Sequence, residues 1–173
     1  MRYFFIFSLI FCLSSTLFAQ NPTPTVQQWQ FHLATADGKK FINSRHIQQP
    51  LLVNFWSVEC PPCVKELPML QQFAQQNPHW QVLLINTDQD RQHAEQFLKK
   101  HKIQLPNLKI SSDANVFMRK AGNHLGGLPY TLALKSGHSK NVCGQHLGAL
   151  NLQHLQQFKQ HCTHSSNQNL SNK

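Results

Sequence analysis

Two cysteines in the first half of the chain have the spacing of a redox-active thiol pair. In Cys60-Pro61-Pro62-Cys63 the thiols are three residues apart, so a helix places them on one face, where they can close a small disulfide ring. Cys60 is expected at the helix N-terminus, where free amides and the helix dipole favour the reactive thiolate. The expected chemistry is attack of Cys60 on a partner disulfide, followed by resolution of the mixed disulfide by Cys63.

Two other uses of such a pair are a zinc site and a permanent structural disulfide. A closed zinc site needs four ligands, usually completed by a second cysteine pair or a histidine pair. Cys143 and Cys162 are isolated, and the segment 161–164, with two histidines, lies in the tail region. A four-residue ring also restricts the unfolded chain too little to act as a staple. We therefore expect redox activity and no metal site.

The segments on either side of the pair are expected to be a buried strand and a helix. Leu51–Trp56 is almost continuously apolar, as in a strand that is buried on both faces. A helix is predicted from about Cys60 to Gln76, with Pro68 as an internal kink. The two prolines between the cysteines fit its first turn, because amides there have no partner within the helix.

The rest of the chain alternates between strand and helix patterns. Asp37-Gly38 is a strong hairpin signal. Further strands are predicted at Trp29–Leu33, Lys39–Ile42, Val82–Asn86, Tyr130–Leu134 and Lys140–Cys143, and helices at Asp90–His101, Asp113–Ala121 and from Leu152 to Cys162. This order predicts an α/β sandwich with a mixed central sheet and an N-terminal hairpin.

Several short motifs surround the cysteine pair in a fixed order. Phe55-Trp56, the Cys-Pro-Pro-Cys motif and Glu66-Leu67-Pro68 together resemble the FW…CxxC…E-x-P signature of the TlpA/ResA-like thioredoxins. Gly127–Thr131 is similar to the loop that carries the family's cis-proline, and the resemblance covers about Trp29 to Phe158. It implies a thioredoxin-like three-layer sandwich with helices on both faces of the sheet. It also implies an exported thiol-disulfide oxidoreductase, whose dithiol needs no cofactor.

The resemblance implies roles for the two thiols and for the proline loop. Cys60 would be the exposed nucleophile and Cys63 the buried resolving thiol. Leu128-Pro129 would form a cis peptide bond against the Cys60 sulfur, with the Leu128 backbone pairing to the incoming partner. An ordinary trans proline that opens a strand is the alternative for Pro129.

Two more side chains take a role from the resemblance. Glu66 matches the family's acidic residue near the dithiol, a candidate proton acceptor, with a solvated helix face as the alternative. Trp56 would shield the site, although core packing explains it almost as well.

Two positions depart from the wider family pattern. Asn54 stands where thioredoxins proper carry a buried aspartate, which removes a candidate base for the resolving thiol, although TlpA-like proteins often have asparagine there. Glu59 replaces the tryptophan that usually precedes the nucleophile, and so alters the surface that a partner meets. Its charge disfavours the thiolate, and Pro61 and Pro62 remove two amide donors near Cys60. Because a weakly stabilised thiolate makes a more reducing dithiol, we expect a reductase with a potential nearer about −270 mV than about −120 mV.

The last two cysteines are not expected to be bridged. Cys143 is predicted to end a strand, whereas Cys162 ends a helix that has run roughly 18 Å from its start, which makes a direct bridge geometrically awkward. Cys162 is therefore interpreted as a small apolar residue on a buried helix face, with the bridge as the lesser alternative.

Composition and charge limit the class of protein. The chain has 173 residues, of which 40% are hydrophobic, enough for one domain with a buried core. Its net charge is +9, but the basic residues are dispersed and no nucleic-acid-binding motif accompanies them. We therefore expect no nucleic-acid partner.

The N-terminus has the pattern of an export segment. Residues 1–19 carry one positive charge and then an apolar run, which predicts a cleaved signal or an uncleaved membrane anchor. Lipidation at Cys12 is a third and weaker alternative. The segment 20–28 is interpreted as a linker, 29–162 as the thioredoxin-like domain and 163–173 as a frayed polar tail. The expected location is the periplasm, with a possible tether to the inner membrane.

The sequence thus favours an exported reductase of protein disulfides. The resemblance extends to the reductases of cytochrome c maturation and implies re-reduction by a membrane electron-donor protein. An oxidase or isomerase on the same scaffold is one alternative. A copper- or zinc-binding chaperone that uses the dithiol and a nearby histidine, such as His124, is the other.

Overall fold

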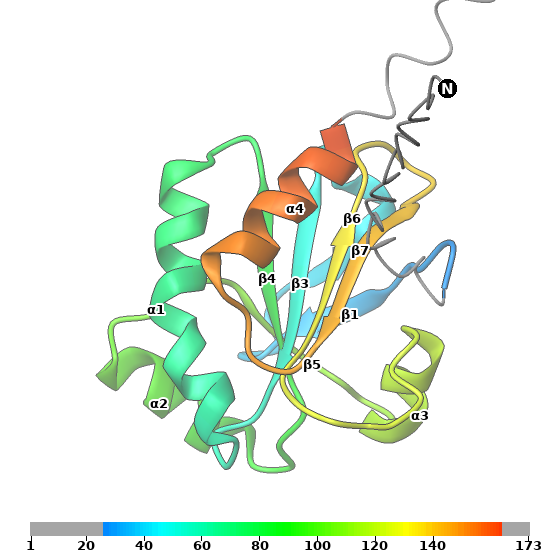
Figure 1. Cartoon of the computed structure of the whole chain (residues 1–173). Helices are drawn as coiled ribbons and strands as arrows, with labels where there is room; N and C mark the ends of the chain where they lie inside the picture. The colour runs from blue at the N-terminus through cyan, green and yellow to red at the C-terminus, as the bar shows by residue number, and fades with distance from the viewer. Residues whose placement is uncertain (1–25, 164–173) are drawn as a thin grey trace, which may run out of the picture.

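A seven-stranded mixed sheet forms the centre of the molecule, and helices cover both of its faces (Figure 1). The computed structural model describes residues 26–163. The strands are β1 (His32–Thr35), β2 (Phe41–Asn43), β3 (Leu51–Trp56), β4 (Gln81–Asn86), β5 (Asn107–Lys109), β6 (Tyr130–Leu134) and β7 (Val142–Leu147). The helices are α1 (Pro61–Gln76), α2 (Arg91–Lys100), α3 (Ala114–Lys120) and α4 (Leu152–Thr163), with a short 3-10 helix, η1 (Ser44–His46).

The strand order is β2-β1-β5-β4-β3-β6-β7, which places β3 near the middle. β3 pairs in parallel with β4 and antiparallel with β6, and all six of its residues are buried. The prediction of a strand buried on both faces is therefore confirmed. Because β3 and β4 are parallel, their carboxyl ends lie side by side at one edge of the sheet.

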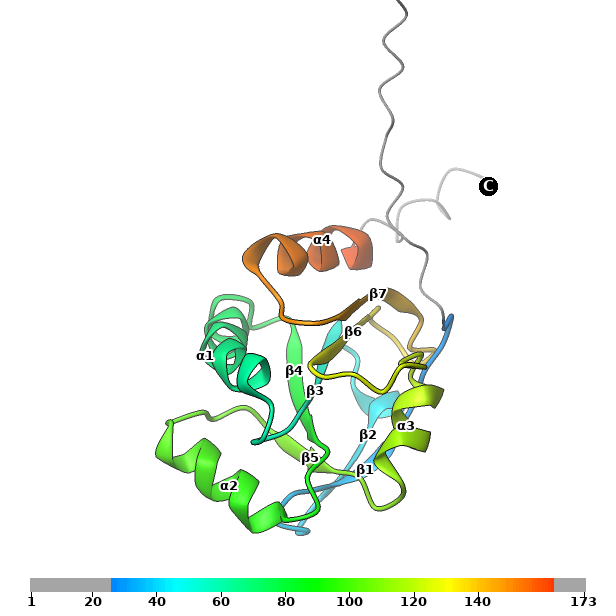
Figure 2. The same ribbon diagram turned by 60° about the horizontal axis from the view of Figure 1, so that its bottom comes forward.

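The two faces of β3 serve two separate hydrophobic clusters. Leu52 and Trp56 belong to a cluster with side chains of α1, α2 and α4, whereas Val53 and Phe55 belong to a cluster that includes Met118 of α3. Figure 2 shows α1, α2 and α4 on one side of the sheet and α3 on the other. The predicted α/β sandwich with helices on both faces is thus confirmed.

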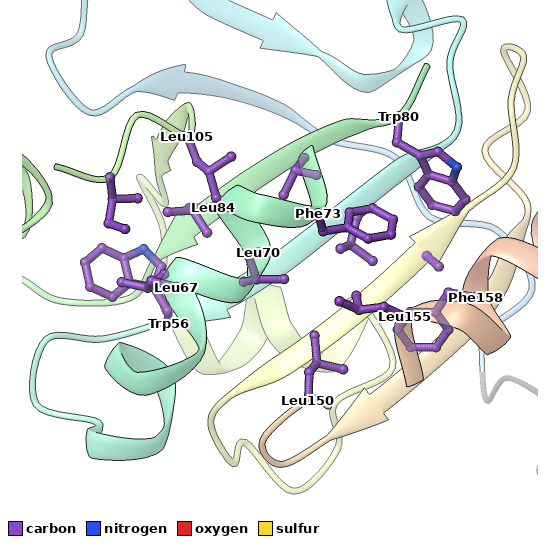
Figure 3. Close-up of a cluster of buried hydrophobic side chains, with 14 of the residues drawn as sticks. Trp56, Leu67, Leu70, Phe73, Trp80, Leu84, Leu105, Leu150, Leu155 and Phe158 are labelled. Carbon is purple, nitrogen blue, oxygen red and sulfur yellow. The ribbon is translucent and has the colours of Figure 1, made fainter. Parts of the chain in front are cut away.

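The large side chains of the first cluster lie between the helices and the sheet (Figure 3). The figure labels Trp56, Leu67, Leu70, Phe73, Trp80, Leu84, Leu105, Leu150, Leu155 and Phe158. At about 25 cal/mol per Å² of apolar surface, this burial is the main source of stability for the elements that position the cysteine pair.

The N-terminal hairpin is confirmed, with shifted strands. Gly38 adopts a positive φ of 72° in the turn, and β1 pairs antiparallel with β2. β1 begins three residues later than predicted, and Trp29 and Phe31 are instead buried in the second cluster. Strand β5 was not predicted, because three residues are too few for a period-two pattern to be visible.

The last strand also starts later than predicted. Lys140 has a positive φ of 47°, which no regular strand accommodates, so β7 begins at Val142. The Lys140 side chain is fully buried and donates hydrogen bonds to the carbonyls of Ile47 and Gln49. Burial lowers the pKa of this amine. A charged residue with such a structural use cannot be recognised from a hydropathy pattern.

A second disulfide joins Cys143 to Cys162, with 5.2 Å between the Cα atoms. The expectation that these cysteines are unbridged was wrong, because Cys143 lies at the start of β7 and not at its end. The chain runs along β7 away from Cys143 by about 14 Å at ~3.4 Å per residue, and α4 then returns by a similar length at ~1.5 Å per residue. The two displacements cancel, and both cysteines are buried in the first cluster.

Gly144 explains how α4 comes close enough to β7 for this bridge. A Cβ atom at Gly144 would lie 2.3 Å from Cδ1 of Phe158, which is far inside van der Waals contact. The missing side chain therefore leaves room for the Phe158 ring directly against the strand.

The predicted export segment, Cys12 and the tail from residue 164 lie outside the described residues. Of the expected linker only residues 26–28 are described, and there Gln28 forms an isolated bridge with Asn141. None of the helices between residues 26 and 163 combines the length and the apolar character that a bilayer crossing requires.

Replacing Cys143 and Cys162 together by alanine is expected to lower the free energy of unfolding by about 3 kcal/mol, since the bridge restricts a loop of intermediate length. Urea unfolding of the oxidised proteins measures the difference. The single variant Cys143→Ala lacks the same bridge and should lose nearly as much as the double variant. Equal midpoints for the wild type and the double variant would contradict a stabilising bridge.

Candidate active site

The cysteine pair lies at the carboxyl end of β3, where the chain enters α1. Cys60 is the N-cap of α1 and is joined by a disulfide to Cys63, with 5.3 Å between the Cα atoms. Pro61 and Pro62 occupy the first turn, as predicted. Cys63 is fully buried and Cys60 is partly exposed. Only Cys60 is therefore open to a macromolecular partner without a change of structure.

The loop that leads to Cys60 is held by Asp88, which follows β4. One Asp88 carboxylate oxygen accepts a hydrogen bond from the Ser57 hydroxyl, and the other accepts from the Val58 amide at 2.9 Å. Asn86 Nδ2 donates to the second oxygen at 2.8 Å. Sequence reasoning missed Asp88, although a polar residue directly after a strand parallel to β3 is the available signal.

Glu66 is buried beneath the site and not part of a solvated helix face. Its side chain is 4% exposed, and it lies one turn beyond Cys63 on the same face of α1. Glu66 Oε1 accepts from Asn54 Nδ2 at 2.7 Å, and Oε2 accepts from the Leu150 amide at 2.7 Å. Burial raises the pKa of Glu66, while the hydrogen bonds from Leu150 and Asn54 oppose that shift.

Asn54 links this carboxylate to the central strands. Its Nδ2 donates both to Glu66 and to the Thr131 hydroxyl, the latter at 3.0 Å. Its Oδ1 is buried and has no hydrogen-bond partner in the described part of the chain. A proton on Glu66 Oε1 would have Asn54 Oδ1 as its acceptor only after rotation of the amide, which would also turn Nδ2 away from the Thr131 hydroxyl.

Trp56 is fully buried in the cluster that also contains Cys63. Its Nε1 donates to Asn107 Oδ1 at 3.1 Å, and its ring lies 6.0 Å from that of Phe97. These contacts support the core-packing interpretation of Trp56. Glu59, by contrast, is exposed, and its backbone amide donates to the Ser57 hydroxyl oxygen at 3.0 Å.

The peptide bond between Leu128 and Pro129 is cis, as expected. Leu128 packs against the cluster that Cys60 also contacts, and the register pairs Tyr130 with Phe55, so the proline loop enters β6 at the end of the sheet where the Cys60 loop leaves β3. The loop is held on both sides of the cis bond. Asn123 Nδ2 donates to the Gly127 carbonyl at 2.8 Å, and the Gly148 amide donates to the Pro129 carbonyl at 2.8 Å.

His124 is exposed and lines a depression together with His146. The ring centroids of His146 and His154 lie 3.9 Å apart, with an angle of 34° between the ring planes. Burial and the neighbouring His154 lower the pKa of His146. Among residues 26–163 no three side chains of histidine, cysteine, aspartate or glutamate are placed to hold one metal ion. The chaperone alternative therefore finds no preformed donor set in this part of the chain.

A comparison with protein families matches residues 18–136 to the Redoxin model. The chain belongs to the Redoxin family. It is 31% identical over 109 residues to sporulation thiol-disulfide oxidoreductase A of Bacillus subtilis, an alignment that covers 60% of the chain and 65% of that protein. The chain thus spans slightly less than two thirds of that relative's length.

Solved structures of similar proteins share the fold of this Redoxin chain. The crystal structure of StoA from Bacillus subtilis aligns with a TM-score of 0.61 and 24% identity, over 79% of the chain and 99% of StoA. A thiol:disulfide interchange protein of the thioredoxin family from Chlorobium tepidum aligns with 0.65 and 20%, over 82% and 98%. A secreted disulfide oxidoreductase of Mycobacterium tuberculosis aligns with 0.62 and 21%, over 76% and 96%. The predicted thioredoxin-like fold and the resemblance to TlpA/ResA-like proteins are confirmed.

Glu66 is expected to make stability depend on pH in a defined direction. Its raised pKa means that the folded protein binds the proton more tightly than the unfolded chain does. From pH 4.5, the ordinary value, up to the raised pKa, the contribution of Glu66 to the unfolding free energy should therefore fall as pH rises. Glu66→Gln removes this contribution, so the unfolding free energy of the wild type minus that of the variant should fall over this range.

Urea unfolding of the oxidised proteins across this pH range measures both curves. Glu59→Gln makes the same substitution at an exposed carboxylate and is the control. Parallel curves for the wild type and Glu66→Gln would show that the buried carboxylate contributes no pH dependence.

Proposed function

We propose that this Redoxin chain is a thiol-disulfide oxidoreductase that exchanges disulfides with protein partners through Cys60 and Cys63. The observation that carries the proposal is the asymmetry of the pair, which joins a partly exposed sulfur at a helix N-cap to a fully buried one. The exposed sulfur can react with a large partner, and the buried sulfur can reach only its neighbour. This division of labour suits a nucleophile and a resolving thiol.

In the direction of reduction, the Cys60 thiolate attacks one sulfur of a client disulfide. The client S–S bond breaks, a mixed disulfide forms, and the leaving client thiolate takes a proton. Cys63 then loses its proton and attacks Cys60 Sγ, which releases the second client sulfur and leaves the Cys60–Cys63 disulfide. Two electrons pass from the protein dithiol to the client, so a dithiol donor must restore the pair after each turnover.

Glu66 is the proposed acceptor for the Cys63 proton. It lies one helical turn from Cys63 on the buried face of α1, and its raised pKa brings its affinity for a proton closer to that of a thiol. Asn54 orients this carboxylate. In the same proposal Pro129 shields the dithiol from solvent, and the Leu128 backbone pairs with the client chain.

We propose that the protein acts as a reductase. Two prolines follow Cys60, and the carboxylates of Glu59 and Asp88 lie in or against the loop that precedes it. Both features disfavour the thiolate and therefore favour the oxidised pair, which makes the dithiol a better electron donor. An oxidase or isomerase would need the opposite balance.

The proposed place of action is the periplasm, where the chain is exported and either released or tethered to the inner membrane. The apolar N-terminal segment supports this, as does the similarity to a secreted oxidoreductase of Mycobacterium tuberculosis. A buried second disulfide is also more stable outside the reducing cytoplasm. A membrane electron-donor protein would then re-reduce the pair, and apocytochrome c is one candidate class of client.

The redox potential separates the reductase from the oxidase. Equilibration of the purified protein in glutathione buffers, with the thiols counted by mass spectrometry after alkylation, is expected to yield a value near about −270 mV for the Cys60–Cys63 pair. A value near about −120 mV, typical of a strong oxidase, would overturn the reductase assignment.

Trapping identifies clients and tests the roles of the two cysteines. In Cys63→Ser the mixed disulfide cannot be resolved, so covalent complexes with client proteins should accumulate in cells. In Cys60→Ser they should be absent, because Cys63 is buried and out of reach. Equal trapping by both variants would contradict the proposed division of labour.

A further inference from the structure

The backbone amides of residues 58–60 donate hydrogen bonds to acceptors other than the Cys60 sulfur. The Val58 amide donates to Asp88 Oδ2 at 2.9 Å and the Glu59 amide donates to the Ser57 hydroxyl oxygen at 3.0 Å. The Cys60 amide donates to the Ser57 carbonyl at 3.2 Å. The acceptors of these three successive amides are therefore Ser57, in the same loop, and Asp88.

The residues after Cys60 add a single donor. Pro61 and Pro62 have no amide hydrogen, and the next amide, that of Cys63, donates to Cys60 Sγ at 3.3 Å. The Val64 amide donates to the Cys60 carbonyl at 3.1 Å and so is engaged elsewhere. Between residues 58 and 64 only one backbone amide stabilises negative charge on the nucleophilic sulfur.

Asp88 is the common acceptor on which this loop arrangement depends. It binds the Ser57 hydroxyl and the Val58 amide together, and Asn86 Nδ2 holds the carboxylate from the other side. The Ser57 hydroxyl, by donating to Asp88, turns its oxygen toward the Glu59 amide. The Asp88 carboxylate thus engages two donors of the loop, the Ser57 hydroxyl and the Val58 amide, and also brings a negative charge to the same loop.

We propose that Asp88 is a positioning residue that keeps the Cys60 thiolate weakly stabilised and thereby sets the dithiol as a reductant. The proposal rests on the thiol-disulfide function proposed above. It makes the direction of electron transfer depend in part on a residue outside the Cys-Pro-Pro-Cys motif. Thiolate stabilisation favours the reduced form of such a pair, so a loop whose donors are engaged by other acceptors and that binds a carboxylate favours oxidation of the pair by the client.

The test compares Asp88→Ala, Asp88→Asn and Ser57→Ala. Asp88→Ala removes both the acceptor and the charge, and is expected to lower the pKa of the Cys60 thiol by on the order of one unit. Ser57→Ala frees the Glu59 amide but retains the carboxylate, and Asp88→Asn retains an acceptor oxygen but removes the charge, so both should give smaller shifts in the same direction. These two variants keep the proposal testable if Asp88→Ala fails to fold.

Two readouts are measured on each variant. The rate of Cys60 alkylation by iodoacetamide against pH gives the thiol pKa, and equilibration with glutathione gives the redox potential. For Asp88→Ala we expect the equilibrium constant with glutathione to shift about tenfold toward the reduced protein, which is about 30 mV upward for a two-electron couple. A general loss of stability moves neither quantity in a defined direction.

Asp90→Asn is the matched control. Asp90 caps α2 by accepting from the Gln92 and His93 amides, and asparagine is an equally good N-cap, so this variant removes one charge two residues away without touching the loop. Its potential and Cys60 pKa should stay close to those of the wild type.

An unchanged or raised Cys60 pKa in folded Asp88→Ala would overturn the proposal, and so would an equal shift in Asp90→Asn. Because alkylation needs no client, this failure is distinct from a failure of the proposed function, which would appear as a Cys63→Ser variant that traps no client through Cys60.

Discussion

The parallel pairing of β3 with β4 brings the carboxyl ends of both strands to one edge of the sheet, with Trp56 opposite Asn86 in the register. The loop that carries Cys60 leaves β3 at this edge, and the loop that carries Asp88 leaves β4 beside it. The position of the nucleophilic sulfur relative to Asp88 therefore depends on a strand register that pairs residues thirty positions apart in the chain, such as Trp56 and Asn86. Burial of β3 on both faces holds this register, since a shift by one residue would exchange the two hydrophobic clusters.

The buried carboxylate depends on the opposite end of the chain. The Leu150 amide, which binds Glu66, lies in the turn between β7 and α4, and both of those elements are fastened by the Cys143–Cys162 disulfide. The second disulfide is thus a structural element that supports the site from a distance, while the first is the proposed reaction centre. Burial of Cys143 and Cys162 keeps them out of reach of the partner that Cys60 meets.

Charge is distributed unevenly around the dithiol. The chain as a whole carries a net charge of +9, yet three of its seven acidic residues, Glu59, Glu66 and Asp88, lie in or against the loop and helix that hold the cysteines. A local negative field disfavours a thiolate, whereas the overall positive charge attracts acidic partners over longer distances. The two effects act at different ranges and are compatible in one protein.

The sequence alone determined the features that depend on neighbours in the chain. The apolar run of β3, the Asp37-Gly38 turn and the start of α1 at the cysteine pair were all predicted, because hydropathy, glycine and proline act locally. The family motifs added the cis bond before Pro129. Tertiary structure decided the contacts that bring distant segments together: Asp88 on the Cys60 loop, the Leu150 amide on Glu66, and the bridge from Cys143 to Cys162. These three contacts depend on the order of the strands in the sheet and on the relative lengths of β7 and α4, which run in opposite directions. No local sequence pattern encodes either property.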